Sequence, residues 1–186
     1  MNKRINILDC TLRDGGYVNK WEFGYYNIKK IITSLVAANV GIIECGLLTN
    51  KIEYDRDYSK FNAVEQIASV LPQKRGNTMF VCMINYGEYD ISDLPKCDGK
   101  SVDGIRVAFH KRNAKEAMRF CAAIKEKGYK VFIQPMVTMS YSDEEVLELI
   151  KIANEIKPYA FYMADSFGTM KQNDIMRFFY LNDNNL

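Results

Sequence analysis

Residues 7–16 have the sequence Ile7-Leu8-Asp9-Cys10-Thr11-Leu12-Arg13-Asp14-Gly15-Gly16. An apolar start that runs into charged residues and two glycines is typical of a buried strand ending in a polar turn. Strand alternation places Asp9, Thr11 and Arg13 on one face, and the two glycines allow Asp14 to turn toward the same place. We therefore expect an arginine and a carboxylate to meet at a strand end.

Six segments rich in β-branched and apolar residues each run into a polar or glycine-containing stretch, which predicts strands buried on both faces. Between most of them, apolar residues recur at helical spacing, as on helices that cover a sheet. The predicted strands are residues 5–10, 40–45, 78–84, 102–109, 129–136 and 160–164, and the clearest apolar helix faces are those of Ile28, Ile31, Ile32, Leu35 and Val36, and of Val146, Leu149, Ile150 and Ala153.

Local signals mark the ends of two of these helices. A capping residue followed three positions later by glutamate predicts a helix start, and Gly128 marks a helix end. The connection 85–100 contains proline and glycines, so it supports only a short helix around 92–96. The capping pairs are Asn113 with Glu116 and Ser142 with Glu145.

The alternation of strands and helices implies parallel strands joined by right-handed crossovers, and hence an α/β fold. An open nucleotide-binding sheet should carry a Gly-x-Gly-x-x-Gly turn after its first strand, and this sequence lacks that spacing. We therefore expect the other arrangement, a (β/α)8 TIM-barrel type. About six of the eight strand-helix units are present, forming one partial domain over residues 1–186.

The composition excludes several classes of function. Lys and Arg total 25 and Asp and Glu total 23, so a net charge of +2 gives no footprint for nucleic acid or an anionic membrane. Neither a signal peptide nor a membrane-length apolar stretch is found, which favours a cytoplasmic protein. The five cysteines are scattered and odd in number, which favours buried thiols over disulfides or a zinc site.

In parallel α/β folds, functional residues collect at the carboxyl ends of the strands. Polar side chains stand at each of the six predicted ends. In chain order they are Asp9, Thr11, Arg13 and Asp14; Glu44; Asn85; Arg106 and His110; Gln134 and Thr138; and Asp165 and Ser166.

The Arg13-Asp14 pair suits one kind of chemistry in particular. A carboxylate binds a hard divalent cation, and an arginine stabilises an oxyanion or enolate that develops on a carboxylate-bearing substrate. The alternative is an internal ion pair that only ties the rim of the barrel together. The spacing alone leaves both open.

The motifs at these strand ends also resemble a known family. Residues 7–16, the segment Ile43-Glu44-Cys45-Gly46, the fourth-strand segment from Gly104 to His110, and Ala164-Asp165-Ser166-Phe167-Gly168-Thr169-Met170 are similar, in the same order, to the strand motifs of the DRE-TIM metallolyases. This family is HMGL-like and pyruvate-carboxyltransferase-like. The resemblance covers nearly the whole chain and is nearest to the 4-hydroxy-2-oxovalerate aldolase branch.

The resemblance implies roles for individual residues. Asp14 would be a ligand of a divalent cation, Mn or Mg, and Arg13 would stabilise an enolate. The residues at the later strand ends would bind substrate. They are Glu44, His110, Gln134, Asp165 and Ser166. Structural alternatives stand beside three of these roles: Glu44 pairs with Arg106, His110 bonds to the loop that follows it, or Asp165-Ser166 fixes the turn before the last helix.

One departure from the family concerns proton transfer. Related aldolases carry a histidine as general base in the turn after the aspartate, whereas this chain has Tyr17. Tyr17 can donate or relay a proton, but an ordinary phenol is a poor base near neutral pH. The general base is therefore unassigned.

The second departure concerns the metal. The family completes its metal site with a His-x-His pair on the seventh strand, and the only histidine here is His110. We expect a truncated piece that binds metal weakly and is inactive alone. Its open sheet edges would favour self-association.

Three hypotheses follow. The leading one is a metal-dependent lyase that cleaves or condenses a 2-oxo acid in aldol fashion. No lysine lies at an apolar strand end, which disfavours a Schiff base. The alternatives are a Claisen-type synthase that joins an acyl-CoA to a 2-oxo acid, and a non-catalytic barrel segment that acts as a binding or assembly module.

Overall fold

The computed structural model describes residues 6–73 and 76–186. The chain divides into two compact units, Met1–Ile105 and Arg106–Leu186. The division falls inside strand β5 (Gly104–Phe109). Each unit is built from strands and helices that alternate along the chain, as the sequence predicts for an α/β protein.

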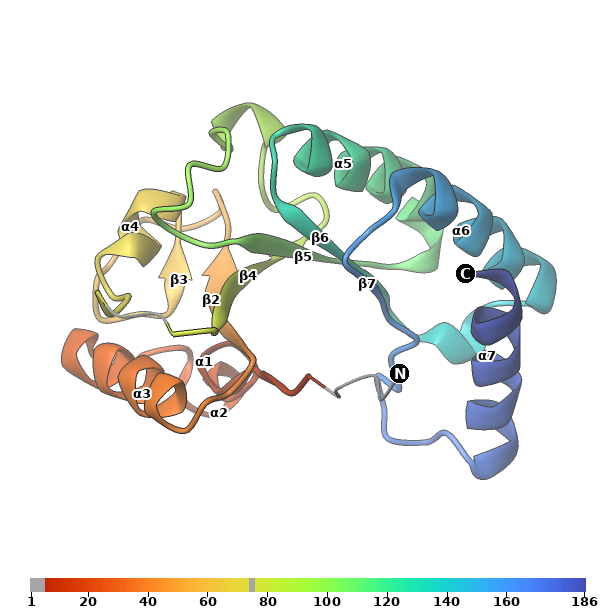
Figure 1. Ribbon diagram of the computed structural model, residues 1–186, viewed down its shortest axis with the longest axis horizontal. Helices are drawn as coiled ribbons and strands as arrows, with labels where there is room; N and C mark the ends of the chain where they lie inside the picture. The colour runs from red at the N-terminus through yellow and green to blue at the C-terminus, as the bar shows by residue number, and fades with distance from the viewer. Residues whose placement is uncertain (1–5, 74–75) are drawn as a thin grey trace. The chain divides into compact units, whose positions relative to one another are not determined.

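In the first unit, a central strand is paired on both sides. β2 (Ile42–Leu48) pairs in parallel with β1 (Leu8–Asp9), with β4 (Met79–Asn85) and, at its far end, with the short β3 (Lys60–Phe61). Every residue of β2 is buried; α1 and α3 pack on it, and β1, β3 and β4 pair with its edges (Figure 1). The register between β2 and β4 shifts between Glu44 and Leu47.

Helical segments surround this strand. The single turns α1 (Thr11–Asp14) and α2 (Gly16–Asn19) follow β1, and α1 packs on β2. Next comes α3 (Tyr25–Ala37), which buries Ile28 and Ile32 as its predicted apolar face requires. The remaining segments are α4 (Val64–Ala68) beside β3 and the 3-10 turn η1 (Ile91–Asp93).

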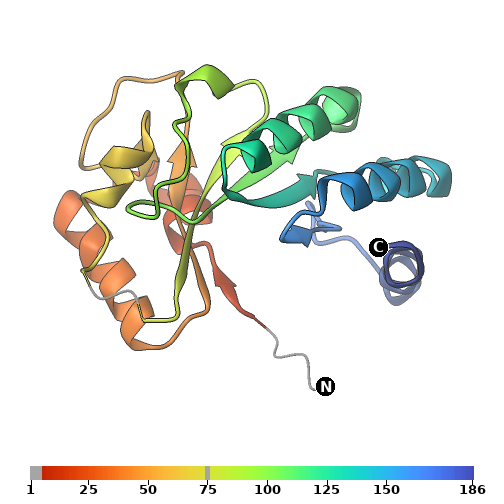
Figure 2. The same ribbon diagram turned by 45° about the horizontal axis from the view of Figure 1, so that its top comes forward.

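The second unit has the strand order β5-β6-β7, with β6 (Lys130–Pro135) parallel to β7 (Ala160–Phe161). Its long helices are α5 (Ala114–Glu126), α6 (Asp143–Ile156) and α7 (Gln172–Asn185). Figures 1 and 2 show α5 and α6 side by side, and α7 packs against α6. The 3-10 turns η2 (Lys111–Asn113) and η3 (Thr138–Ser140) follow β5 and β6.

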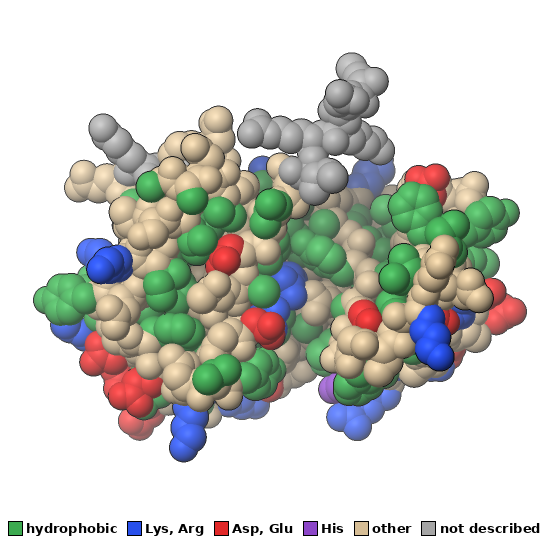
Figure 3. All heavy atoms as spheres, turned by 90° about the horizontal axis from the view of Figure 1, so that it is seen from below, with side chains coloured by type: hydrophobic (Ala, Val, Ile, Leu, Met, Phe, Trp, Pro, Cys, Tyr) green, Lys and Arg blue, Asp and Glu red, His purple; other side chains and the backbone are tan. Residues whose placement is uncertain are grey.

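The last helix has two different faces. It buries Phe178 and Leu181, whereas its opposite side exposes a run of large apolar residues, which are Ile175, Met176, Phe179 and Tyr180. Figure 3 shows hydrophobic side chains gathered over this part of the surface, at the right of the view. Within the described residues, no helix is long and apolar enough to cross a membrane.

The structure confirms most predicted elements but corrects the first one. Of the predicted strand 5–10, Ile5 lies outside the described residues, and within residues 6–10 only Leu8–Asp9 forms a strand. Thr11–Asp14 is helical, so the alternation predicted for Asp9, Thr11 and Arg13 is wrong. The reason is local. The Asp9 carboxylate accepts hydrogen bonds from the backbone N–H and the hydroxyl of Thr11, which turns the chain out of the extended conformation.

The predicted helix ends are confirmed in part. Ser142 and Glu145 form the reciprocal capping box, with distances of 3.3 and 2.8 Å. Asn113 precedes α5, but its side chain makes no capping hydrogen bond. In the connection after β4, the short helix is η1 rather than residues 92–96, because the Asp90 carboxylate caps it at Ser92.

Gly46 provides a test of the packing around β2. Its φ is +145°, and a Cβ there would lie 2.1 Å from the carbonyl oxygen of Ser59. We expect Gly46→Ala to lower the free energy of unfolding by roughly 2–4 kcal/mol in urea denaturation, because the chain must shift as well as adopt a disfavoured φ.

Gly99→Ala is the matched control. Gly99 also has a positive φ, of +74°, but nothing lies within 4 Å of its added Cβ. Its expected loss is about 1 kcal/mol, from the backbone alone. Equal losses in the two variants would contradict the close approach at Gly46.

Candidate functional site

The centre of the candidate site is an arginine held between two carboxylates. Arg13 Nε lies 2.8 Å from Glu44 Oε2, and Arg13 Nη1 lies 2.7 Å from Asp14 Oδ1. Arg13 is 9% exposed and Glu44 is fully buried within β2. The turn α1 therefore places the Arg13 guanidinium against a carboxylate that is buried within β2.

Burial and charge act in opposite directions on Arg13. Burial by itself would lower the pKa of its guanidinium, but the charge and hydrogen bond of Glu44 and the charge of Asp14 outweigh that effect and raise the pKa. Arg13 therefore stays protonated throughout the accessible pH range. Glu44 gives it a fixed orientation, whereas Asp14 faces solvent, with a side chain 61% exposed.

Trp21 holds the backbone of this turn in place. Its indole Nε1–H donates to the carbonyl oxygen of Arg13 at 2.8 Å. The ring also lies over Gly16, where a Cβ would come within 2.1 Å of it. Gly16 is therefore required because the ring leaves no room for a side chain, and not for its backbone, which is helical in α2. This corrects the expectation that the freedom of the two glycines allows Asp14 to turn.

Two further side chains contact Trp21. The ring of Tyr17 meets it edge-on, with 4.8 Å between centroids, and the Lys60 ammonium lies 3.7 Å from the centre of the indole. Tyr17 is 67% exposed, so its hydroxyl is accessible to solvent. Trp21 and Lys60 are not among the residues predicted from the sequence, although Trp21 is the only tryptophan in the chain.

Other polar side chains of the first unit form hydrogen bonds with the backbone or with each other. Besides the role of Asp9, the Ser59 hydroxyl donates to the carbonyl oxygen of Leu12 at 2.6 Å, which ties α1 to the segment before β3. Asn85 donates to Glu88 at 3.2 Å. Arg13, Asp14 and Glu44 are thus the predicted residues that the first unit brings together.

In the second unit, predicted residues hold two loops against each other. Ser166 Oγ accepts a hydrogen bond from the N–H of Val137 at 2.8 Å, and the Thr138 hydroxyl donates to the carbonyl oxygen of Ala164 at 2.6 Å. Val137 has a positive φ of 54°. The segments after β6 and β7 are therefore joined by side-chain bonds to backbone.

Asp165 organises the turn that follows it. Its carboxylate accepts the backbone N–H groups of Thr169 at 3.0 Å and Met170 at 2.9 Å. The bond from Met170, supported by other backbone N–H groups of the turn, holds the pKa of Asp165 below its usual range. This geometry agrees with the structural alternative, in which Asp165-Ser166 fixes the turn before the last helix.

The remaining predicted residues differ in how far they are exposed. His110 is exposed at the start of η2 and makes no capping bond with its side chain. Gln134 is half-buried in β6. The Arg106 guanidinium lies 5.4 Å from the centre of the Tyr162 ring, in a cation–π contact within the second unit.

The donor set for a metal ion is small. No group of three His, Cys, Asp or Glu side chains within residues 6–73 and 76–186 is arranged to hold one. Asp14 uses Oδ1 for Arg13 and presents the rest of an exposed carboxylate. The site therefore offers one oxygen ligand suited to a hard cation.

Solved structures define the class of fold. The N-terminal domain of a protein from Bacteroides vulgatus matches 97% of this chain and 60% of its own, with a TM-score of 0.73 and 23% identity. The carboxyl transferase domain of pyruvate carboxylase from Rhizobium etli matches the whole chain and 34% of its own, with a TM-score of 0.72 and 16% identity. The fold is a partial (β/α)8 barrel, as expected.

The family follows from the sequence itself. The HMGL-like family model matches residues 4–182, and the chain belongs to this family. The resemblance to the DRE-TIM metallolyases is thereby confirmed.

Two relatives with a curated description are named aldolases. The 4-hydroxy-2-oxovalerate aldolase 2 of Comamonas testosteroni is 26% identical over 178 residues, covering 93% of this chain and 50% of its own. The 4-hydroxy-2-oxovalerate aldolase of Carboxydothermus hydrogenoformans is 27% identical over 185 residues, covering 94% and 52%. The chain spans about half the length of these relatives.

The buried pair predicts a large effect of one neutral substitution. Glu44→Gln leaves the Arg13 guanidinium buried without its main counter-charge, so we expect a loss of about 3 kcal/mol in the free energy of unfolding. The matched control is Asp98→Asn, which removes an exposed partner 3.9 Å from Lys100 and should cost under about 1 kcal/mol. Similar losses in both variants would contradict a dominant role for the Arg13–Glu44 pair.

The turn at Asp165 predicts a pH dependence. Because the folded pKa of Asp165 is depressed, its contribution to stability is complete above the unfolded pKa of about 3.9 and is lost as pH falls through the folded value. Carbon-13 NMR titration should give a pKa for Asp165 below the ordinary value of an aspartate, which is about 3.9. Asp165→Asn should flatten the acid limb of the stability curve, and an unchanged acid limb would count against this interpretation.

Proposed function

We propose that this chain is part of a divalent-metal-dependent carbon-carbon lyase that cleaves or forms a bond of a 2-oxo acid in aldol fashion. The observation that carries the proposal is the Arg13-Asp14 pair, fixed on buried Glu44 and presented at the end of β1. Membership of the HMGL-like family and the aldolase relatives support it.

In this proposal, Asp14 provides one ligand of the cation, Mn or Mg. Its carboxylate is exposed, and Arg13 occupies only one of its oxygens. A divalent cation bound there would supply Lewis-acid polarisation of the carbonyl group of a 2-oxo acid. A single carboxylate binds such a cation weakly, so further ligands are needed for tight binding.

Arg13 stabilises negative charge on the substrate oxygen. A guanidinium carries five N–H donors, and the two ion pairs use Nε and one hydrogen of Nη1. The other donors are available for a carboxylate or enolate oxygen. Because Glu44 holds the group rigidly, little reorganisation is needed when that charge develops.

Proton transfer is assigned to Tyr17 as donor or relay. Tyr17 lies in α2, three residues after Asp14, and its exposed side chain contacts the ring of Trp21 edge-on. A phenol is in general better suited to donating a proton than to removing one near neutral pH. The general base is left unassigned.

For the second unit, we propose that His110 and Gln134 contribute to substrate binding. Asp165 and Ser166 act through the loops they hold, since their side chains bond to backbone groups. Glu44 likewise acts through Arg13. These three are positioning residues in the proposal.

Two other functions are alternatives to the aldol lyase. A Claisen-type synthase would use the same pair, but the aldolase relatives favour the aldol reaction. A non-catalytic binding or assembly module is favoured by the small donor set among the described residues. Metal binding separates it from the lyase.

The test is a titration of Mn²⁺ followed by water proton relaxation, with and without pyruvate. We expect weak binding that pyruvate strengthens at least several-fold, and a loss of tenfold or more in affinity in Asp14→Asn. The matched control is Asp98→Asn, whose side chain is similarly exposed at 59% and which should bind as the unmodified chain does.

The opposite result is equally clear. If Asp14→Asn retains its Mn²⁺ affinity, or if pyruvate has no effect on it, the lyase proposal fails and the non-catalytic module is preferred. Arg13→Lys provides a second reading, because it keeps the charge and loses the forked geometry. We expect it to reduce the effect of pyruvate and leave the affinity for Mn²⁺ alone unchanged.

A further inference from the structure

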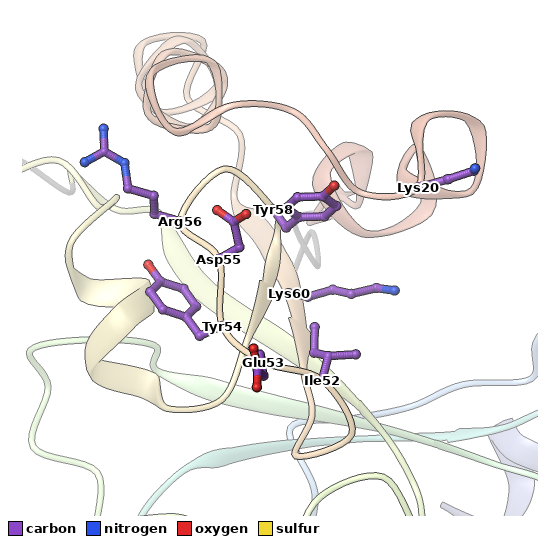
Figure 4. Close-up of a pocket in the computed structure, with 8 residues that line it drawn as sticks. All are labelled: Lys20, Ile52, Glu53, Tyr54, Asp55, Arg56, Tyr58 and Lys60. Carbon is purple, nitrogen blue, oxygen red and sulfur yellow. The ribbon is translucent and has the colours of Figure 1, made fainter.

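A pocket of about 750 Å³ lies in the first unit, beside the Arg13–Trp21 turn. Figure 4 shows its lining, which comes from the segment after β2, from the start of β3 and from the end of α2. The lining residues that matter here are Lys20, Ile52, Tyr58 and Lys60. The pocket is open to solvent, and the proposed chemistry at Asp14 does not use its residues.

Two lysines give one side of this pocket a positive charge. Figure 4 shows Lys20 and Lys60 extending toward the same side, with Ile52 next to Lys60. Within the described residues, neither ammonium group takes part in an ion pair; Lys60 instead lies over the indole of Trp21. Two cations that line one pocket and take part in no ion pair within that part of the chain attract an anion.

The backbone that carries Lys20 is unusual. Lys20 and Trp21 both have positive φ, of 58° and 67°, which bulky residues rarely adopt. The conformation is fixed by hydrogen bonds, in which Trp21 donates its N–H to Gly16 and accepts from the N–H of Ser59. The fold therefore fixes the origin of the Lys20 side chain, on the rim of the pocket.

The other charged residues of the lining are directed elsewhere. The Arg56 guanidinium lies 4.7 Å from the centre of the Tyr25 ring, and Asp55 accepts the N–H of Asp57 at 3.0 Å. Tyr58 donates its hydroxyl to Glu22 at 3.1 Å. Glu53 lies below Lys60 in Figure 4, away from Lys20. The side of the pocket that Lys20 and Lys60 share is therefore cationic, next to an apolar contact.

We propose that this pocket binds a carboxylate group of a small organic acid between Lys20 and Lys60, with Ile52 in contact with its carbon chain. Trp21 contacts both Lys60 and the Arg13 carbonyl, so the pocket adjoins the proposed lyase site through one side chain. If this acid is also the lyase substrate, it is a 2-oxo acid with a second carboxylate, which this pocket binds. That identification rests on the proposed function.

The test uses succinate as the probe and the fluorescence of Trp21, the only tryptophan, as the signal. We expect a saturable change in emission with succinate, and none with the neutral succinamide. Calorimetry on the variants should show at least a tenfold loss of affinity in Lys60→Gln and in Lys20→Gln. Lys60→Arg should retain most of the affinity.

Lys100→Gln is the matched control, since Lys100 is an exposed lysine of the same unit. It should bind succinate as the unmodified chain does. Equal binding of succinamide, or unchanged affinity in both lysine variants, would overturn the proposal. Tighter binding of inorganic phosphate than of succinate would also overturn it, because the site would then select phosphate.

This result is separable from the metal test. Succinate binding should persist in Asp14→Asn and in the absence of Mn²⁺. If succinate binds while Mn²⁺ does not, the anion pocket is supported and the lyase proposal is rejected. Loss of succinate binding in Asp14→Asn would instead contradict a separate anion pocket.

Discussion

The desolvation of Glu44 is the constraint on which the first unit depends. A carboxylate inside a strand that is buried along its whole length is costly unless a cation meets it, and Arg13 is that cation. The requirement extends outward from there. Arg13 reaches Glu44 only if the chain curls after β1, and the curl keeps its position because Trp21 packs on Gly16 and bonds to the Arg13 carbonyl. Core stability and the geometry of the candidate site therefore share the same contacts.

Much of the fold could be predicted from the sequence because its signals are long and repeated. Buried strands such as β2 and β4 and amphipathic helices such as α3 and α6 carry many residues that agree with one another. Short elements could not be predicted where one side chain determines the local conformation. The sequence predicts an extended strand through Arg13, but hydrogen bonds to the Asp9 carboxylate turn the chain there. The strand β3 has only two residues, which is too few to show a periodicity.

The candidate site was predictable to the same degree. Arg13, Asp14 and Glu44 stand next to buried strands, so position along the chain found them, and the structure joins all three. Trp21 and Lys60 lie 39 residues apart, and only the folded chain brings them together. For Asp165 and Ser166, the sequence could not distinguish a ligand-binding role from a bond to backbone, because both use the same oxygen atoms.

The two left-handed residues at Lys20 and Trp21 have a consequence for engineering. Each such conformation costs on the order of 1–3 kcal/mol, which the neighbouring hydrogen bonds must offset. A procedure that selects only for thermostability would replace Lys20 early, with asparagine or glycine, and gain from the relief of its backbone strain. Trp21 would be retained, because its indole holds the Arg13 turn in place. At Lys20, tolerance to heat and recognition of an anion are therefore opposing demands on one residue.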